Sequence, residues 1–488
     1  MTKRKKLKIR KVLLVRPDAL GDVTLMIPMI NTLKENYPSI KISVLMQRYA
    51  APLLENHPNV DHIILDWKKE GKCNSVSEFF AYARAIKACN FDAVIFSYLD
   101  AFYAWLSFFA GIKIRIGDGQ KIGLRFLLTH PINQYFRKLS LHETEQNNRL
   151  LEVLSPNLKK VTRMDLYSSE QSEKDLGDLL RYYGLSDKKY IIIHPATGGG
   201  NRAWLPQKYA ELINMIHEKS SWNVVITGFG KKEYEINEQI IKYCHKRPYN
   251  FYEKTTLDQL KVLIKKSLMV IGTDTGPTHM AAALGIPVVC ISPTKFVKSL
   301  RWGPWQVKNA IVGEPGSCPL SCNPYKCKET FCLDAISAET VFLEMNRVIN
   351  VENETSFSKS NWLKASINIG LCVSTEKELE IAQQYQEKLK IENFRVKLLI
   401  TNKDLLTHLN LNSGYSYLNM VNVFSLIRII SSQDINCIHI VSNKKIWFWK
   451  LIRQLAAPFM YCPPVIIPGV NQSKNVCFSD FYLKAFSE

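Results

Sequence analysis

Short apolar runs alternate with longer amphipathic segments along the first 350 or so residues. Runs such as Lys11–Arg16 (KVLLVR) and Tyr190–His194 (YIIIH) are almost continuously apolar, as expected for strands buried on both faces. Segments with apolar residues at helical spacing separate them, for example Val23–Tyr37 and the run QKYAELINMIHEK. Strands that alternate with helices predict mostly parallel sheets covered by helices on both faces.

The alternating pattern restarts near Tyr190, which predicts two successive Rossmann-like α/β halves with ligands at the carboxyl ends of their strands. Composition sets the boundaries that we expect. The chain would comprise a basic tail (1–11), a first half (12–165), a second half (166–350), a polar linker (351–361) and an accessory α/β domain of unknown role (362–488). We find no catalytic constellation in the last of these.

The net charge of +20, from 64 basic and 44 acidic residues, predicts an anionic partner. Nucleic acid, a phosphorylated substrate and an anionic membrane surface all fit, but no basic-aromatic module or zinc-finger spacing supports nucleic acid. The sequence contains no secretory signal pattern and no apolar stretch of the ~20 residues that span a bilayer. We therefore expect an intracellular protein that touches a membrane at most from the side.

Four of the twelve cysteines lie close together, at Cys318, Cys322, Cys327 and Cys332. Four thiols could close a tetrahedral structural zinc site. The spacing of three, four and four residues lacks the paired two-residue knuckle, so reduced thiols or a redox pair remain the alternatives.

The stretch Val270–Pro287 (VIGTDTGPTHMAAALGIP) carries the densest polar chemistry in the chain. A buried strand leads into a small-residue loop and then a helix that ends at Gly285, an arrangement that places helix N–H groups and the positive end of the helix dipole at an anion. The loop after Tyr190–His194 (PATGGGNR) adds a hydroxyl, three glycines and a guanidinium. Together the two loops predict a diphosphate site. The absence of GxxxxGK[ST] and GxGxxG patterns excludes a P-loop and disfavours a dinucleotide dehydrogenase.

Asp22 follows the first strand in the loop PDALGD. An aspartate here could serve as a helix N-cap or, facing a diphosphate across a cleft, as a general base. The residue itself leaves both roles open.

Several segments in order resemble the family 9 glycosyltransferases, the heptosyltransferases of lipopolysaccharide core assembly. They are VRPDALGDVTLMIPMINTLKENYP, HPATGGGNRAWLPQKYAEL, TGFGKKEYE, TLDQLKVLIKKSLMVIGTDTGPTHMAAALGIPVVCISPT and RWGPW. The resemblance spans residues 10–350 or so and implies a GT-B fold. It further implies inverting transfer of heptose from ADP-heptose, without a catalytic metal, to a phosphorylated lipid A-linked core acceptor.

The resemblance also implies roles for individual residues. Asp22 would be the catalytic base. The donor-binding residues would be Thr197, Arg202, Glu233 (with Glu235 as a rival), Asp274, Thr275, Gly276 and His279. Arg149, in the segment His142–Leu154, would contact the acceptor. The first half would bind the acceptor and the second the nucleotide sugar.

The resemblance predicts a cytoplasmic enzyme that associates peripherally with the inner face of the cytoplasmic membrane. The basic tail would contribute to that association. Two alternatives remain: a transferase that uses another nucleotide sugar or acceptor, and a non-catalytic nucleotide-sugar or glycan-binding assembly protein.

Overall fold

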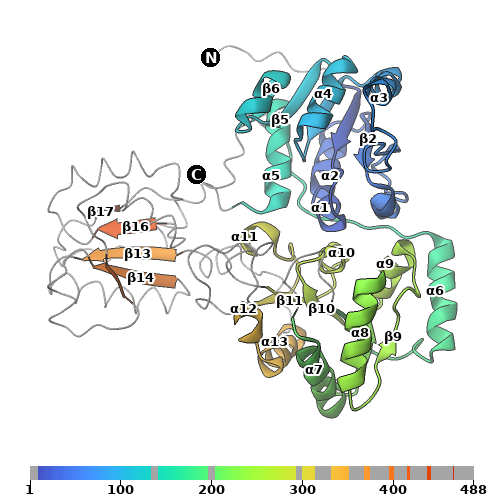
Figure 1. The fold of residues 1–488 in the computed structure, drawn as a ribbon, viewed down its shortest axis with the longest axis vertical. Coiled ribbons are helices and arrows are strands. Elements are labelled where there is room, and N and C mark those ends of the chain that lie inside the picture. The colour runs from blue at the N-terminus through green and yellow to red at the C-terminus, as the bar shows by residue number, and fades with distance from the viewer. Residues whose placement is uncertain are drawn as a thin grey trace. The chain divides into compact units, whose positions relative to one another are not determined.

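A computed structural model describes residues 9–132, 141–155, 157–195, 204–292, 299–313 and 331–350, together with five strands after residue 367. The chain divides into two units, the first of which holds both predicted halves while the second holds the later strands. Figure 1 colours the first half blue to cyan and the second half green to yellow.

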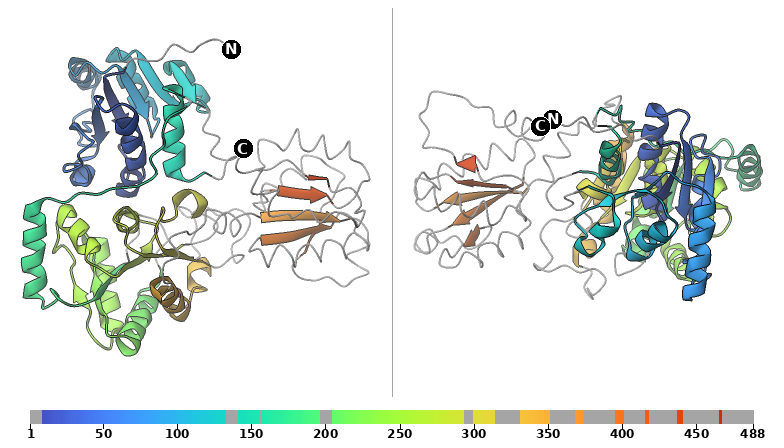
Figure 2. Two further views of the ribbon diagram at one scale, coloured as in Figure 1. Left: turned by 180° about the vertical axis from the view of Figure 1, so that it is seen from behind. Right: turned by 90° about the horizontal axis from the view of Figure 1, so that it is seen from above.

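Six parallel strands form the first sheet, in the order β3-β2-β1-β4-β5-β6. Val12 and Leu14 pack in one cluster with α2, whereas Leu13 and Val15 pack with α3 and α4, so helices cover both faces (Figure 2). The strands are β1 (Lys11–Val15), β2 (Lys41–Met46), β3 (His62–Leu65), β4 (Ala93–Phe96), β5 (Ile114–Asp118) and β6 (His130–Ile132). The helices are α1 (Leu20–Thr24), α2 (Ile27–Asn36), η1 (Arg48–Leu53), α3 (Val76–Ala88), α4 (Ala101–Phe109), η2 (Ile122–Leu127), α5 (Glu143–Arg149) and η3 (Leu150–Val153).

The second sheet repeats this topology, in the order β12-β11-β10-β7-β8-β9. Its strands are β7 (Tyr190–His194), β8 (Asn223–Ile226), β9 (Tyr249–Asn250), β10 (Met269–Thr273), β11 (Val288–Ile291) and β12 (Asn309–Val312). Its helices are α6 (Glu170–Tyr182), α7 (Pro206–Lys219), α8 (Lys231–Tyr243), α9 (Leu257–Lys265), α10 (Gly276–Ala283), α11 (Ser299–Trp302), α12 (Phe331–Asp334) and α13 (Ala338–Asn350). In each sheet the first strand of the half lies beside the fourth, and the strand order reverses there. Open parallel sheets bind ligands at this point, so ligand sites are expected at the carboxyl ends of β1 and β4 and of β7 and β10.

The second unit contains a third parallel sheet, in the order β15-β14-β13-β16-β17. Its strands are β13 (Asn368–Val373), β14 (Arg395–Ile400), β15 (Tyr415–Tyr417), β16 (Cys437–Ile440) and β17 (Val465–Ile466). Three of these strands, β13, β14 and β16, lie in the segments SINIGLCV, RVKLLIT and INCIHIV. The expected linker at 351–361 lies outside the described residues.

Three helix boundaries differ from the sequence-based expectation. The helix expected over Val23–Tyr37 begins earlier, at Leu20, and is broken between α1 and α2. Pro28 has no N–H to donate to the preceding turn and lies in the first turn of α2, which explains the break. The segment GKKEYE, expected as a loop, is mostly the first turn of α8. Helix α10 starts at Gly276, one residue before the expected Pro277.

The two halves of the first unit contact each other at the N-terminal ends of α1 and α10. A Cβ atom on Gly21 would lie 2.4 Å from Cδ2 of His279, and one on Gly276 would lie 2.9 Å from Cβ of Leu20. These glycines are therefore required by close approach and not by an unusual φ. Nearby, Nζ of buried Lys261 on α9 donates 2.8 Å to the carbonyl oxygen of Pro52 in η1.

We predict that Gly21→Ala destabilises the first unit by roughly 1–3 kcal/mol, because the added methyl group forces the His279 ring to move. Urea denaturation measures the effect. Gly177→Ala on α6 is the matched control, since a Cβ there meets nothing within 4 Å. Alanine in place of a glycine inside a helix should be neutral or stabilising by up to about 1 kcal/mol. An unchanged urea midpoint for Gly21→Ala would show that the two helix ends do not approach this closely in solution.

Candidate active site at the carboxyl ends of the strands

Asp22 lies in the first turn of α1, three residues after the N-cap Ala19. Ala19 and not Asp22 occupies the N-cap position, so the N-cap interpretation of Asp22 is wrong. Its Oδ1 instead accepts a hydrogen bond from Nη2 of Arg16, the residue that follows β1. The carboxylate is thus held by a buried guanidinium at the switch point of the first sheet.

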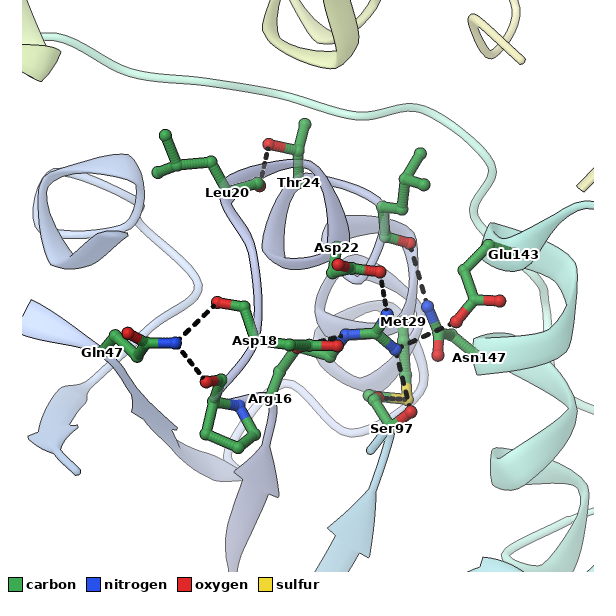
Figure 3. A network of polar contacts seen from close by, with 12 residues as sticks. Arg16, Asp18, Leu20, Asp22, Thr24, Met29, Gln47, Ser97, Glu143 and Asn147 are labelled. Carbon is green, nitrogen blue, oxygen red and sulfur yellow. Dashed lines mark hydrogen bonds and ion pairs between the residues drawn. The ribbon is translucent and has the colours of Figure 1, made fainter. Parts of the chain in front are cut away.

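Arg16 is the centre of this network, which Figure 3 shows at close range. The side chain is almost fully buried and forms ion pairs with three carboxylates, Asp18 (2.9 Å), Asp22 and Glu143 (3.0 Å). Its Nη1 also donates to the carbonyl oxygen of Ser97, which follows β4 (2.8 Å). Arg16 therefore ties together the ends of β1 and β4, the start of α1 and the start of α5.

Glu143 extends the ion network into the second half. Its Oε1 pairs with Arg16, and its Oε2 accepts a hydrogen bond from Nε of Arg301 on α11 at 2.9 Å. Burial alone would raise the pKa of Glu143, but the two guanidinium groups hold that pKa below its usual value. The contacts from Asp22 through Arg16 and Glu143 to Arg301 are therefore all ion pairs between a carboxylate and a guanidinium.

Asp18 has a different electrostatic environment. Burial, together with the neighbouring carboxylates of Asp22 and Glu143, raises its pKa from 3.8 to about 7 despite the ion pair with Arg16. One guanidinium cannot neutralise three carboxylates, so the carboxyl group of Asp18 retains its proton to a higher pH than an ordinary aspartate. The loop is fixed from the other side by Gln47, whose Nε2 donates to the carbonyl oxygen of Pro17 at 2.6 Å.

His142, the N-cap of α5, makes a second contact between the halves. Its Nε2 lies 2.9 Å from the carbonyl oxygen of Gly303, and its ring stacks on Trp305 with centroids 4.4 Å apart. The backbone N–H of Thr144 donates to Nδ1, so the proton of the neutral ring is on Nε2. Burial lowers the pKa of His142 to about 4, which keeps the ring neutral at physiological pH. The motif RWGPW is thus part of the contact between the halves.

On the second half, α10 presents its N-terminus at the end of β10. The hydroxyl of Thr278 accepts a hydrogen bond from the N–H of Thr275 (3.1 Å) and lies within bonding distance of the carbonyl oxygen of Thr273 (3.0 Å). Nε2 of the buried His279 lies 2.9 Å from Oδ1 of Asp274. Asp274, Thr275 and Gly276 are only partly buried, so they remain accessible to a ligand.

Nδ1 of His279 is buried without a hydrogen-bond partner among the described residues. The same ring packs against Gly21, the residue before Asp22. The structure therefore brings the GD motif of the first half next to the TDTG loop and the start of α10 in the second half.

Glu233 occupies the first turn of α8, where its Oε2 accepts a hydrogen bond from the N–H of Phe229 at 2.7 Å. Burial raises the pKa of this carboxyl group. Glu235, its rival as a ribose ligand, is exposed on the same helix. The preference for Glu233 stays a prediction.

The segment His142–Leu154 contacts the Arg16 network through its first residues, whereas the sequence singled out Arg149. Arg149 closes α5, about 9 Å along the helix axis from Glu143. Among the described residues, no hydrogen bond or ion pair joins Arg149 to Asp22 or Arg16, so its role as an acceptor ligand stays a prediction. His142 and Glu143 are the residues that reach the site. The sequence signal for Glu143 was weak, because a glutamate in a first helical turn is ordinarily a solvated dipole partner.

The side chains of the remaining predicted site residues are not described by the structure. Thr197 and Arg202 lie outside the described residues, as do Cys318, Cys322 and Cys327; Cys332 belongs to α12, but its side chain is not described. The described side chains contain no group of three or more His, Cys, Asp or Glu that could hold a metal ion. Within the same residues, no helix is both long and apolar enough to cross a membrane.

Comparison with known proteins agrees with this geometry. Residues 79–330 match the model of glycosyltransferase family 9 (heptosyltransferase). The lipopolysaccharide core heptosyltransferase OpsX of Haemophilus influenzae is 27% identical over 62% of this chain and 84% of its own length.

Solved structures share the fold. A family 9 glycosyl transferase from Veillonella parvula superposes with a TM-score of 0.62 at 20% identity, covering 70% of this chain and 98% of that one. The E. coli ADP-heptose LPS heptosyltransferase II superposes with a TM-score of 0.56 at 21% identity, covering 70% of this chain and 98% of that one.

Two parallel sheets of repeated Rossmann-like topology form a GT-B-like α/β fold. The chain belongs to glycosyltransferase family 9, and its expected fold and enzyme class are confirmed. The alternative of a non-catalytic assembly protein is accordingly set aside.

The pKa of Asp18 predicts a pH-dependent stability. The folded protein retains the Asp18 proton up to about pH 7, whereas the unfolded chain releases it near pH 3.8. The folded state thus binds more protons in between, and the contribution of this group is lost as the pH rises from about 4 to about 7. Asp18→Asn removes this dependence. The Tm of the variant minus the Tm of the wild type should therefore increase from pH 5 to pH 7.

Asp61→Asn is the control for this experiment. Burial opposes ionisation of Asp61, but Lys41 and Lys34 lower its pKa to about 2, so its contribution is complete above about pH 4 and lost only below it. Its effect on Tm should be constant between pH 5 and pH 8. A constant effect of Asp18→Asn over the same range would contradict the raised pKa.

Proposed function

We propose that this chain transfers heptose from ADP-heptose to a lipopolysaccharide core acceptor with inversion at the anomeric carbon. In this proposal the first half binds the acceptor and the second half binds the nucleotide sugar. The observation that carries it is the contact between Gly21 and His279, because it brings the base candidate Asp22 next to the loop that holds Asp274. Family membership and the heptosyltransferases among its relatives support the choice of sugar.

Asp22 is the proposed general base. Arg16 engages its Oδ1, and among the described residues nothing is hydrogen-bonded to the other oxygen, which is available to an acceptor hydroxyl. The carboxylate would take the hydroxyl proton as the oxygen forms its bond to the anomeric carbon. The bond from that carbon to the diphosphate breaks on the opposite face, and ADP leaves with the bonding electrons.

The donor would lie along the N-terminus of α10. Asp274 would accept hydrogen bonds from sugar hydroxyls, while Thr275, Gly276 and His279 would face the diphosphate, where the helix dipole stabilises the developing negative charge. Arg202 and Thr197 complete the diphosphate site, and Glu233 binds the ribose. Arg202 and the N-terminus of α10 would stabilise the negative charge that a divalent cation stabilises in other transferases. The proposal therefore requires no metal for catalysis.

The acceptor also suggests a place of action. A cytosolic nucleotide sugar and a lipid-linked acceptor meet at the inner face of the cytoplasmic membrane. We therefore propose that the enzyme works there as a peripheral protein, and the net charge of +20 supports contact with an anionic surface.

Asp22→Asn should lower the transfer rate by about 10²- to 10⁴-fold, the usual loss when a positioned base is removed. ADP affinity, measured by calorimetry, should change little because the base does not contact the nucleotide. ADP release from ADP-heptose in the presence of a delipidated core acceptor provides the rate.

Asp187→Asn, at an exposed position, is the matched control and should behave as wild type. Full transfer activity in Asp22→Asn would refute Asp22 as the base. Equal loss of rate and of ADP binding would indicate a structural role instead.

Asp274→Asn should weaken ADP-heptose binding at least tenfold while changing ADP binding less than about threefold, since a hydrogen bond to a charged group contributes roughly 1.5–3 kcal/mol. The asparagine oxygen can still accept from Nε2 of His279, so the local structure should survive. Calorimetric titrations with the two nucleotides give the comparison. A loss of equal size for both would mean that Asp274 does not recognise the sugar.

A further inference from the structure

Aromatic side chains cover the outer face of α4, where a soluble helix ordinarily carries polar groups. Trp105, Phe108 and Phe109 are all exposed, and the inward face of the helix is supplied by other residues, including Tyr103 and Leu106. The spacing of 105, 108 and 109 places the three rings on one side of the helix. They therefore form an outward stripe that does not belong to the core.

Neighbouring elements enlarge this stripe into a continuous surface. Phe80 of α3 lies 5.1 Å from Phe109, and Phe126 of η2 lies 5.8 Å from Trp105, as measured between ring centroids. Phe126 is 68% exposed. Helices α3 and α4 pack on the same face of the first sheet (Figure 1). We call the five rings of Phe80, Trp105, Phe108, Phe109 and Phe126 the aromatic surface.

Basic residues outnumber acidic ones on these elements, although Glu78 of α3 and Asp100 at the start of α4 reach the surface. Between residues 101 and 132 the basic residues are Lys113, Arg115, Lys121 and Arg125, and the only acidic residue, Asp118, is buried. Arg115 lies over the ring of Phe108 at 5.4 Å and is fixed by hydrogen bonds to the carbonyl oxygens of Ile112 and Leu127. On α3, Arg84 and Lys87 are exposed, while the carboxylate of Glu78 is engaged in capping its own helix.

We propose that the aromatic surface docks on an anionic lipid bilayer. Rings with an apolar body suit the boundary between headgroups and acyl chains, and the surrounding basic groups suit phosphate-bearing headgroups. A protein partner would require complementary acidic groups of fixed geometry, whereas a bilayer requires only an excess of basic groups, which is observed. This inference rests on the proposed action at the membrane, for which it names the surface, and does not depend on which sugar the enzyme transfers.

The surface also has a consistent position relative to the site. Asp100 is the N-cap of α4, and Ser97, between β4 and α4, accepts a hydrogen bond from Arg16. The connection from which α4 starts is therefore held by the same guanidinium that holds Asp22.

The test is co-sedimentation of the full-length protein with vesicles of phosphatidylcholine alone or with about one third phosphatidylglycerol. The wild type should bind the anionic vesicles and lose binding as salt is raised. Phe108→Ser combined with Phe126→Ser should reduce partitioning by roughly tenfold or more, because two exposed rings no longer enter the interface. Lys113→Glu combined with Arg125→Glu should reduce it and weaken the salt dependence.

Tyr182→Ser combined with Leu343→Ser removes two exposed apolar side chains from the second half and is the matched control, expected to bind as wild type. All variants should keep wild-type transfer rates on a delipidated acceptor, so failure of the proposed function is separable from failure of the docking proposal.

Three outcomes would overturn the proposal. The first is no wild-type binding to anionic vesicles. The second is unchanged binding of the Phe108/Phe126 variant, especially if removal of residues 1–9 abolishes binding. The third is a wild-type dimer in light scattering that the Phe108/Phe126 variant makes monomeric, which would show that a second copy covers this face.

Discussion

The buried guanidinium of Arg16 is the interaction on which the site depends. It joins the ends of two strands, the first turn of α1 and the first turn of α5 through three carboxylates and one carbonyl group. A buried charge left without its partners typically costs about 3–5 kcal/mol, so each partner constrains the others. Because Asp22 is one of these partners, the orientation of the proposed base follows from the same constraint that holds the first half together.

The network also couples the two halves. Glu143 contacts Arg16 with one oxygen and Arg301 of the second half with the other. His142, its neighbour, is fixed between Gly303 and Trp305. In a two-domain transferase the base and the donor must be held close together in a fixed orientation. His142 and Glu143 provide a physical contact between the two halves. The close approach of Gly21 to His279 supplies the steric part of the same link.

The fold was largely predictable from local pattern. Continuous apolar runs predicted β1, β2, β7 and β10 because strands buried on both faces exclude polar residues. The errors fell at helix starts. The first turn of a helix accommodates the same Gly, Asp and Lys residues as a loop, so ALGD and GKKEYE did not reveal that they are helical. For the aromatic helix α4, only the packing shows which rings face outward.

The sequence by itself determined the class of the protein, because motifs in fixed order encode strand ends and loops that are local in the chain. It also nominated Asp22, Asp274 and His279, whose residue types and positions after strands are local features. Only the tertiary structure decided that Asp22 is held by Arg16 and does not cap α1, and that Glu143 shares the same guanidinium. These contacts join residues more than a hundred positions apart, or depend on which face of a short helix is buried. Neither property is written in the local pattern of hydrophobic and polar residues.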